Sequence, residues 1–258
     1  MHLLEINNIS LSFGGLKAVD EVSLQVEEGE IVSLIGPNGA GKTTIFNILT
    51  GIYNINSGEI SFKGQAIHNR IPQDIVKIGI ARTFQNIRLF RNMRVIENVL
   101  IGSHIMKPYG FFSTVFRTRS FRESERENTV NAVRLIRDVG LLHRTHEYAA
   151  NLSYGEQRKL EIARALATGA NLLLLDEPAA GMNPQESEEL LHFIFSLRDR
   201  GYTILLIEHD MNVVMNISDR IYVLDYGKLI SEGLPKEVAS DPKVIEAYLG
   251  GVPDAQDK

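Results

Sequence analysis

Apolar and polar residues alternate along the first thirty positions of the chain. The apolar side chains of this pattern are Ile9, Leu11 and Phe13, followed by Val22, Leu24 and Val26. A period of two is typical of strands that bury one face, and glycine turns at Gly14-Gly15 and Gly29 separate these strands. Residues 58–67 show another such strand and turn. We therefore predict an antiparallel β layer at the start of the chain.

Three short and almost wholly apolar runs predict buried strands, at residues 31–35, 172–175 and 203–207. Between about residues 71 and 165 apolar residues instead recur at helical spacing, most clearly in 92–100 and 130–136. Residues 219–233 predict a closing β-hairpin through Tyr226-Gly227-Lys228. The fold class is therefore α/β, with a mostly parallel sheet, an N-terminal antiparallel β layer and an inserted helical subdomain.

These patterns assign residues 1–250 to one elaborated domain. Its core takes residues 1–85 and 166–250, and the helical subdomain takes 86–165 with an insert at 107–128. The tail at 251–258, which is rich in polar residues after Pro253, is expected to be disordered.

Composition narrows the class of protein. The 258 residues are 44% hydrophobic and 23% charged, which suits a large buried core. No apolar run approaches about 18 residues, so we expect neither a membrane span nor a secretion signal. The absence of cysteine excludes disulfides and thiolate zinc sites, and fits a reducing cytoplasm. A net charge of −5 argues against nucleic acid as the main partner.

A glycine-rich loop follows the first buried run. It matches the phosphate-loop pattern G-x-x-x-x-G-K-[ST] and reads Gly36-Pro37-Asn38-Gly39-Ala40-Gly41-Lys42-Thr43-Thr44. Glycines let backbone N–H groups close around phosphate oxygens, and the helix N-terminus adds roughly half a positive charge. Lys42 would reach the β- and γ-phosphates, and the Thr43 hydroxyl would hold Mg²⁺. The alternative is a chance glycine-rich turn, against which the flanking strand and helix argue.

Acidic residues end the later buried runs. Asp176 and Glu177 follow the run at 172–175, and in α/β sheets ligands gather outside the carboxyl ends of strands. Asp176 is placed for Mg²⁺ and Glu177 for a water molecule. His209 would reach the same edge if the strands are parallel, although it could equally be an ordinary polar residue at a strand end. Phe13 could stack on a base or belong to the core.

The insert at 107–128 mixes aromatic and basic residues. Its aromatics are Tyr109, Phe111, Phe112, Phe116 and Phe121, and its arginines are Arg117, Arg119, Arg122 and Arg126. The segment is either an amphipathic cover on the core or a docking surface for a partner or anionic lipid.

A further motif lies between the acidic strand ends and the phosphate loop, and it reads Asn151-Leu152-Ser153-Tyr154-Gly155-Glu156-Gln157-Arg158. With this motif included, the chain resembles the ATP-binding subunit of ABC transporters over its whole length. The elements that carry the resemblance come in the family's order: the loop at 36–43, Gln85 in Thr83-Phe84-Gln85, the signature at 152–157, the acids at 176–177, and His209. The resemblance implies the ABC ATPase fold, with ATP and Mg²⁺ bound. It also implies an ATP sandwich, in which Ser153, Gly155 and Glu156 of one subunit close on the γ-phosphate held by another.

The resemblance also implies individual roles and partners. Glu177 would polarise the attacking water, His209 would contact the γ-phosphate, and Phe13 would stack on adenine. Gln85 would sense Mg²⁺ and water and link the site to the helical subdomain. The chain would be peripheral on the inner face of the cell membrane, beside a second ATPase subunit, identical or related. Transmembrane permease subunits would carry the substrate, which a binding protein delivers.

Two positions depart from the common family pattern. Tyr154 stands where the signature usually has glycine. The loop after Glu177 reads Ala180-Gly181-Met182-Asn183, and it ends in asparagine where the family often has aspartate. Together with residues 82–90 and the insert, these variants resemble the LivG-type subgroup that serves branched-chain amino acid importers. The alternatives are an ABC ATPase for lipopolysaccharide export or for another amino-acid or amide substrate, and a binding module with little turnover. The presence of Glu177 argues against the binding module.

Local structure offers a second interpretation of the signature. Ser153-x-x-Glu156 is a capping box, and Asn183-Pro184-x-Glu186 is an N-cap followed by proline at the first helical position. Both readings are compatible, because a capped helix N-terminus binds an anion where its donors face a phosphate.

Overall fold

The computed structural model describes residues 2–105 and 119–249, and the chain forms two compact units. The first unit holds the residues up to Pro72, Leu174–Glu177 and those from Phe195 onward; the second holds the described parts of Gln73–Leu173 and Pro178–Ile194. The division of the domain at residues 86 and 165 stays a prediction. The expected tail at 251–258 lies outside the described residues, as does the insert before residue 119.

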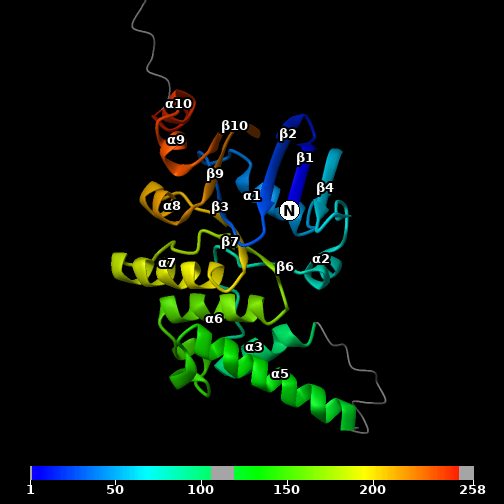
Figure 1. The fold of residues 1–258 in the computed structure, drawn as a ribbon, viewed down its shortest axis with the longest axis vertical. Helices are drawn as coiled ribbons and strands as arrows, with labels where there is room; N and C mark the ends of the chain where they lie inside the picture. Colours follow the sequence, from blue (N-terminus) through cyan, green and yellow to red (C-terminus); the bar gives the residue numbers. More distant parts are fainter. Residues whose placement is uncertain (1, 106–118, 250–258) are drawn as a thin grey trace, which may run out of the picture. The chain divides into compact units, whose positions relative to one another are not determined.

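The first unit begins with an antiparallel sheet in the strand order β2-β1-β4-β5 (Figure 1). Its strands are β1 (His2–Phe13), β2 (Leu16–Glu27), β4 (Ser57–Phe62) and β5 (Gln65–Ala66). Ile6 and Ile9 of β1 are both fully buried although they lie three positions apart, an odd spacing that would put them on opposite faces of a regular strand. The pairing with β2 shifts register between them, and Asn8 has a φ of 48°. The predicted antiparallel layer is confirmed, with a bulge that the alternation did not reveal.

A second sheet of the first unit has its strands in the order β10-β9-β3-β8-β7, and β7 contributes Leu174–Asp176 to this unit. These strands are β3 (Ile31–Ile35), β7 (Leu172–Asp176), β8 (Thr203–Ile207), β9 (Arg220–Asp225) and β10 (Lys228–Gly233). β3 pairs in parallel with both β8 and β9, whereas β9 and β10 form an antiparallel hairpin. Every residue of β3 and β8 is buried, as expected for parallel strands covered on both faces.

Short helices pack on the end of β3 where the glycine-rich loop begins. α1 (Lys42–Leu49) continues from that loop, while α8 (Met211–Ile217), α9 (Pro235–Ala239) and α10 (Pro242–Leu249) follow later in the chain. Ile35 at the end of β3 shares one apolar cluster with Val214 of α8, Val238 of α9 and Val244 of α10. The C-terminal helices therefore support the residue that precedes the loop.

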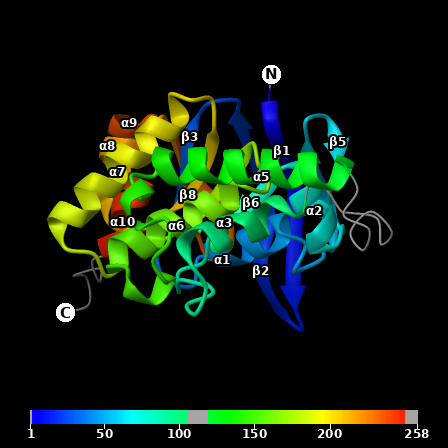
Figure 2. The same ribbon diagram turned by 90° about the horizontal axis from the view of Figure 1, so that it is seen from below.

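The second unit is mainly helical, which confirms the helical pattern predicted there. It contains α2 (Pro72–Ile78), β6 (Ile80–Arg82), α3 (Val95–Ser103), α5 (Arg119–Asp138), η1 (Leu142–Arg144), η2 (Ala149–Asn151), α6 (Tyr154–Leu166) and the start of α7 (Pro184–Arg198). α3 packs against both α5 and α6 (Figures 1 and 2). Gly102 permits this close packing, since a Cβ there would lie 2.4 Å from the Arg164 carbonyl oxygen.

Candidate nucleotide-binding site

The glycine-rich loop runs from the buried end of β3 into α1, and two of its glycines are required by close backbone neighbours. Gly36 has a φ of 148°, and a Cβ there would lie 2.0 Å from the Leu224 carbonyl oxygen. Gly41 has a φ of 103°, and its Cβ would lie 2.6 Å from the Ala18 carbonyl oxygen. L side chains rarely adopt these conformations. The tight loop thus depends on residues that have no side chain.

Lys42 is held inside this loop. Its ammonium group donates to the carbonyl oxygens of Gly36 at 2.6 Å and Pro37 at 2.9 Å, and only 8% of the residue is exposed. Burial lowers the pKa of Lys42, while the carboxylates of Glu177 and Asp176 oppose that change. The first unit therefore places a lysine cation within the loop and close to two acids.

A cavity of about 320 Å³ lies over the loop, and several of the predicted site residues line it. Asn38, Gly39, Ala40, Gly41, Lys42, Thr43, Thr44 and Glu177 line it, together with Leu16, Lys17, Ala18, Tyr226 and Gly227. Gly36 and Pro37 serve as acceptors for Lys42 and are outside the lining. The structure thus brings the loop and Glu177 to one cavity, as the sequence predicted.

The Tyr226-Gly227 turn also lines this cavity. The sequence predicted the hairpin that contains this turn but did not indicate that the turn lies at the site. Tyr226 and Gly227 have φ values of 43° and 80°, which suit a two-residue hairpin turn. The Gly227 N–H donates to the Ala40 carbonyl at 3.0 Å, and its own carbonyl accepts from Asp20 at 2.8 Å. The turn therefore braces the loop from β9 and β10, through contacts that no local pattern indicates.

Glu177 and His209 meet at the carboxyl ends of β7 and β8. The Glu177 N–H donates to the Ile207 carbonyl at 2.9 Å, and His209 Nδ1 lies 3.8 Å from Glu177 Oε2. Asp176, beside them, is buried. Glu177 has a φ of 45°, a conformation that is uncommon for a residue other than glycine and that clusters at functional sites. The predicted meeting of these residues at one edge is confirmed, and their catalytic roles stay predictions.

The donor set of the cavity suits a nucleotide accompanied by Mg²⁺. Backbone N–H groups, the Lys42 ammonium and the Thr43 hydroxyl are groups that bind phosphate oxygens or a hard cation. Among the described residues no three His, Cys, Asp or Glu side chains gather as a metal cage. Mg²⁺ usually takes one or two protein oxygens beside phosphate and water, so Thr43 and Asp176 are a fitting set.

Phe13 ends β1 and is 47% exposed. Its ring meets Tyr53 edge-on, with 5.1 Å between the ring centroids. The alternative that Phe13 belongs to the core is therefore wrong, because a core aromatic would be covered. An exposed aromatic face is what a stacking platform for a base requires, and that role stays a prediction.

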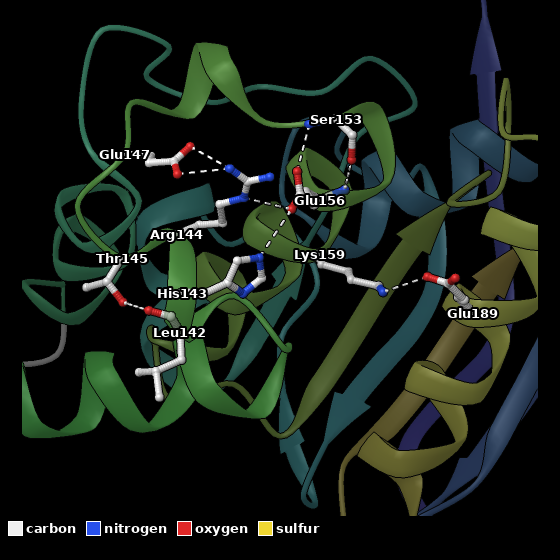
Figure 3. Close-up of polar contacts among 9 residues, drawn as sticks. All are labelled: Leu142, His143, Arg144, Thr145, Glu147, Ser153, Glu156, Lys159 and Glu189. Atoms are coloured by element: carbon white, nitrogen blue, oxygen red, sulfur yellow. Dashed lines mark hydrogen bonds and ion pairs between the residues drawn. The ribbon is translucent and has the colours of Figure 1, made fainter.

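The signature segment begins α6 in the second unit, and both predicted caps are present. The Ser153 hydroxyl accepts from the Glu156 N–H at 3.3 Å, and the Glu156 carboxylate accepts from the Ser153 N–H at 2.9 Å (Figure 3). Asn183 and Glu186 exchange the same pair of hydrogen bonds at the start of α7, at 2.9 and 3.1 Å. A cavity of about 230 Å³ is lined by Ser153, Gly155, Glu156, Lys159, Met182, Glu186, Glu189 and Leu190.

The two departures from the family pattern lie next to each other. A Cβ added at Gly181 would be 3.9 Å from the Tyr154 ring, and Gly181 has a φ of 78°. Tyr154 itself is 40% exposed. The tyrosine ring thus lies beside Gly181, in the loop that follows Glu177 in sequence.

Gln85 is anchored by Arg158, a residue that sequence reasoning missed. The Arg158 guanidinium is fully buried, pairs with Glu161 at 2.7 Å, and donates to the carbonyl oxygens of Phe84 at 2.6 Å and Gln85 at 2.7 Å. Glu161 also accepts from the Arg88 N–H at 3.0 Å. A buried arginine is costly unless its charge is paired and hydrogen-bonded, and the bonds from its two terminal nitrogens hold the backbone around Gln85.

Across residues 2–105 and 119–249, no helix has the length and apolar character that a membrane crossing requires.

Comparisons with known proteins agree with the geometry. The ABC transporter family model matches residues 19–180, and the model for branched-chain amino acid ATP-binding cassette transporters matches residues 228–254. The high-affinity branched-chain amino acid transport ATP-binding protein LivG of Escherichia coli is 49% identical over 249 residues, which cover 96% of this chain and 98% of LivG. BraF of Pseudomonas aeruginosa is 46% identical, with the same coverage.

A solved structure is similar throughout. The crystal structure of an ATP-binding cassette of an ABC transporter in its ADP conformation aligns with a TM-score of 0.85 and 36% identity. The alignment covers 97% of this chain and 99% of that one.

Proposed function

Because the chain belongs to the ABC transporter family of ATP-binding cassettes, we propose that it powers an importer of branched-chain amino acids as its ATP-hydrolysing subunit. The observation that carries the proposal is the cavity in which the Lys42 loop meets Glu177. The likeness to LivG and BraF over almost the whole chain supports the substrate class.

Hydrolysis follows from residues that line this cavity and from Asp176 and His209, which lie beside Glu177. The loop N–H groups and Lys42 bind the phosphates and stabilise the charge of the transferring γ-phosphoryl group. Thr43 and Asp176 would hold Mg²⁺, which when bound neutralises further phosphate charge. Glu177 accepts a hydrogen bond from water and orients it for in-line attack on phosphorus, and His209 contacts the γ-phosphate beside it.

A second ATPase subunit completes the site in this proposal. The signature of one subunit, with Ser153, Gly155 and Glu156, faces the γ-phosphate that the loop of the other holds. The capped N-terminus of α6 supports this role, because it presents backbone donors and the positive end of a helix dipole. The partner is a related ATPase subunit or a second copy of this chain.

The second unit offers a docking surface for the permease. A cavity of about 400 Å³ combines apolar Phe90, Ile101 and Ile105 with basic Arg82, Arg88 and Arg164. The Arg158 network links this region to the backbone of Gln85. Transmembrane permease subunits bind at this cavity, at the inner face of the membrane, and a binding protein delivers the amino acid to them.

Reconstitution tests the proposed substrate. The chain is expressed with the permease, partner ATPase and binding-protein genes that neighbour its own, and uptake of labelled leucine, isoleucine and valine into ATP-loaded proteoliposomes is measured. We expect ATP-dependent uptake of all three. Uptake of an unrelated amino acid or amide alone, with these three excluded, would overturn the substrate class but leave the ATPase assignment intact.

Replacing Ser153 with alanine separates its capping role from its role toward phosphate. Loss of the cap alone costs about 1 kcal/mol of stability and leaves the rate per folded molecule unchanged. We expect a lower rate in addition to this loss of stability: the assembled complex should hydrolyse ATP more slowly, while the isolated subunit keeps its ATP affinity. Glu237→Ala is the matched control, since Glu237 accepts from the Leu234 N–H at 2.8 Å and caps α9. A Ser153→Ala complex with the normal rate would leave only the cap.

Polar replacement of Phe111, Phe112 and Phe116 tests the insert at three residues that lie outside the described part of the chain. Five aromatics beside four arginines exceed what a solvated cover needs. We expect weaker association with permease-containing membranes and unchanged ATP affinity. Val130→Ser, at an apolar position of α5 that is 63% exposed, is the control outside the insert. Loss of solubility and fold in the triple variant would instead support the core-cover interpretation.

A further inference from the structure

The capping carboxylate of the signature has a second partner outside α6. Arg144, at the end of η1, donates from Nε to Glu156 Oε1 at 3.3 Å and from Nη1 to both oxygens of Glu147 at 2.9 and 3.0 Å (Figure 3). The other oxygen of Glu156 is the one that accepts from the Ser153 N–H. A continuous set of hydrogen bonds therefore joins Glu147, Arg144, Glu156 and the backbone of Ser153.

The turn that carries Arg144 is itself held by the backbone. The Val95 N–H donates to the Glu147 carbonyl at 2.9 Å, and the Ile96 N–H donates to the Thr145 carbonyl at 3.1 Å. These are donors of the first turn of α3, which a helix cannot satisfy internally. Because α3 holds the carbonyl groups of Thr145 and Glu147, Arg144 reaches Glu156 from a defined position.

Glu156 presents an electrostatic problem for the proposed function. A carboxylate in the first turn stabilises a free helix, but it is a like charge for any phosphate that approaches the same N-terminus. Its side chain is 22% exposed, so solvent screens it only in part. Partial burial alone would raise the pKa of Glu156, yet hydrogen bonds from Ser153 and the Arg144 cation outweigh burial and lower it. Glu156 is thus kept as an anion whose compensating cation is Arg144.

We propose that Arg144 is the positioning residue of the signature: it compensates Glu156 and holds its carboxylate in the capping box, so that the N-terminus of α6 receives the γ-phosphate of a second ATPase subunit. The inference rests on the proposed function and adds to it a residue outside every motif that the sequence indicated. His143 lies at the rim of this cluster, with Nε2 3.9 Å from Glu156 Oε1, and is 66% exposed. Arg144 makes the closer contact and always carries its charge.

A double-mutant cycle tests the pair. R144Q, E156Q and the double variant are compared in the assembled complex for kcat and KM for ATP, with ATP affinity and melting measured on each isolated subunit. R144Q is expected to raise the complex's KM for ATP about fivefold, since the uncompensated carboxylate then faces the phosphate, with little change in affinity of the isolated subunit. In the E156Q background the same change should alter KM less than about twofold, because no charge is left to compensate.

Arg198→Gln is the matched control for this cycle. Arg198 is 32% exposed, close to the 36% of Arg144, and likewise pairs with two carboxylates, those of Asp199 and Asp219. It should leave KM unchanged. R144K, which retains the charge, should keep the KM of the complex close to the wild-type value, and it replaces R144Q in the cycle if R144Q folds poorly.

Two results would overturn the positioning role: an R144Q complex with the KM of R198Q, or a double variant whose KM exceeds that of E156Q by the full factor seen for R144Q alone. A wild-type complex without any ATPase activity would instead contradict the proposed function. The two failures are therefore distinguishable.

Discussion

Replacing Glu177 with glutamine is expected to lower the steady-state ATPase rate of the assembled complex by about 10²- to 10⁴-fold, the usual contribution of a group that handles the proton of an attacking water. The amide keeps the shape of the side chain but loses the negative charge, and a donating NH2 group replaces one of the two oxygens that can accept from water. ATP affinity of the isolated subunit should stay within about threefold, because the Lys42 loop is untouched. Rate and affinity are measured on the same preparation.

Glu188→Gln is the control for this experiment, since Glu188 on α7 is 76% exposed and the same atom is changed there. If the working pair is heteromeric, ATP-trapped dimers of the Glu177 variant should form only when the partner ATPase is added. Near-normal hydrolysis by Glu177→Gln would refute its assignment as the residue that orients water.

Gly36→Ala should weaken nucleotide binding severely. The new Cβ would lie 2.0 Å from the Leu224 carbonyl oxygen, a contact that the β9 backbone cannot relieve without moving. The backbone conformation adds strain of about 1–3 kcal/mol. Because the Gly36 carbonyl also accepts from Lys42, a shifted loop would misplace the lysine, and we expect ATP affinity to fall by about 100-fold or more. Isothermal titration with ATP measures this loss.

Gly201→Ala separates strain from clash. Gly201 has a φ of 88°, and no atom lies within 4 Å of a Cβ placed there. This control should lose about 1–2 kcal/mol of stability and bind ATP normally. Equal ATP affinity of Gly36→Ala and Gly201→Ala would contradict the requirement for close backbone approach at the loop.

Some features of the site could be predicted from the sequence because the residues that form them are close together in the chain. The phosphate loop is nine contiguous residues, 36–44, and its glycines and lysine indicate their roles together with the apolar runs on either side. The capping boxes at Ser153 and Asn183 span four residues each, and the structure has both. The meeting of Glu177 with His209 required one further rule, that parallel strands share a carboxyl edge.

The sequence by itself therefore determined the α/β class, the nucleotide site and the capped signature, since each depends on residues near one another in the chain. The tertiary structure alone decided which distant groups complete them. The bulge at Asn8, the Gly227 brace on Ala40, the Arg158 anchor of Gln85, and the Arg144 cation at Glu156 are examples. Each joins segments by a register shift, a backbone contact or the hydrogen bonds of a charged side chain. Such contacts follow from the packing of whole elements, because periodicity specifies which face a residue takes and not which partner it meets there.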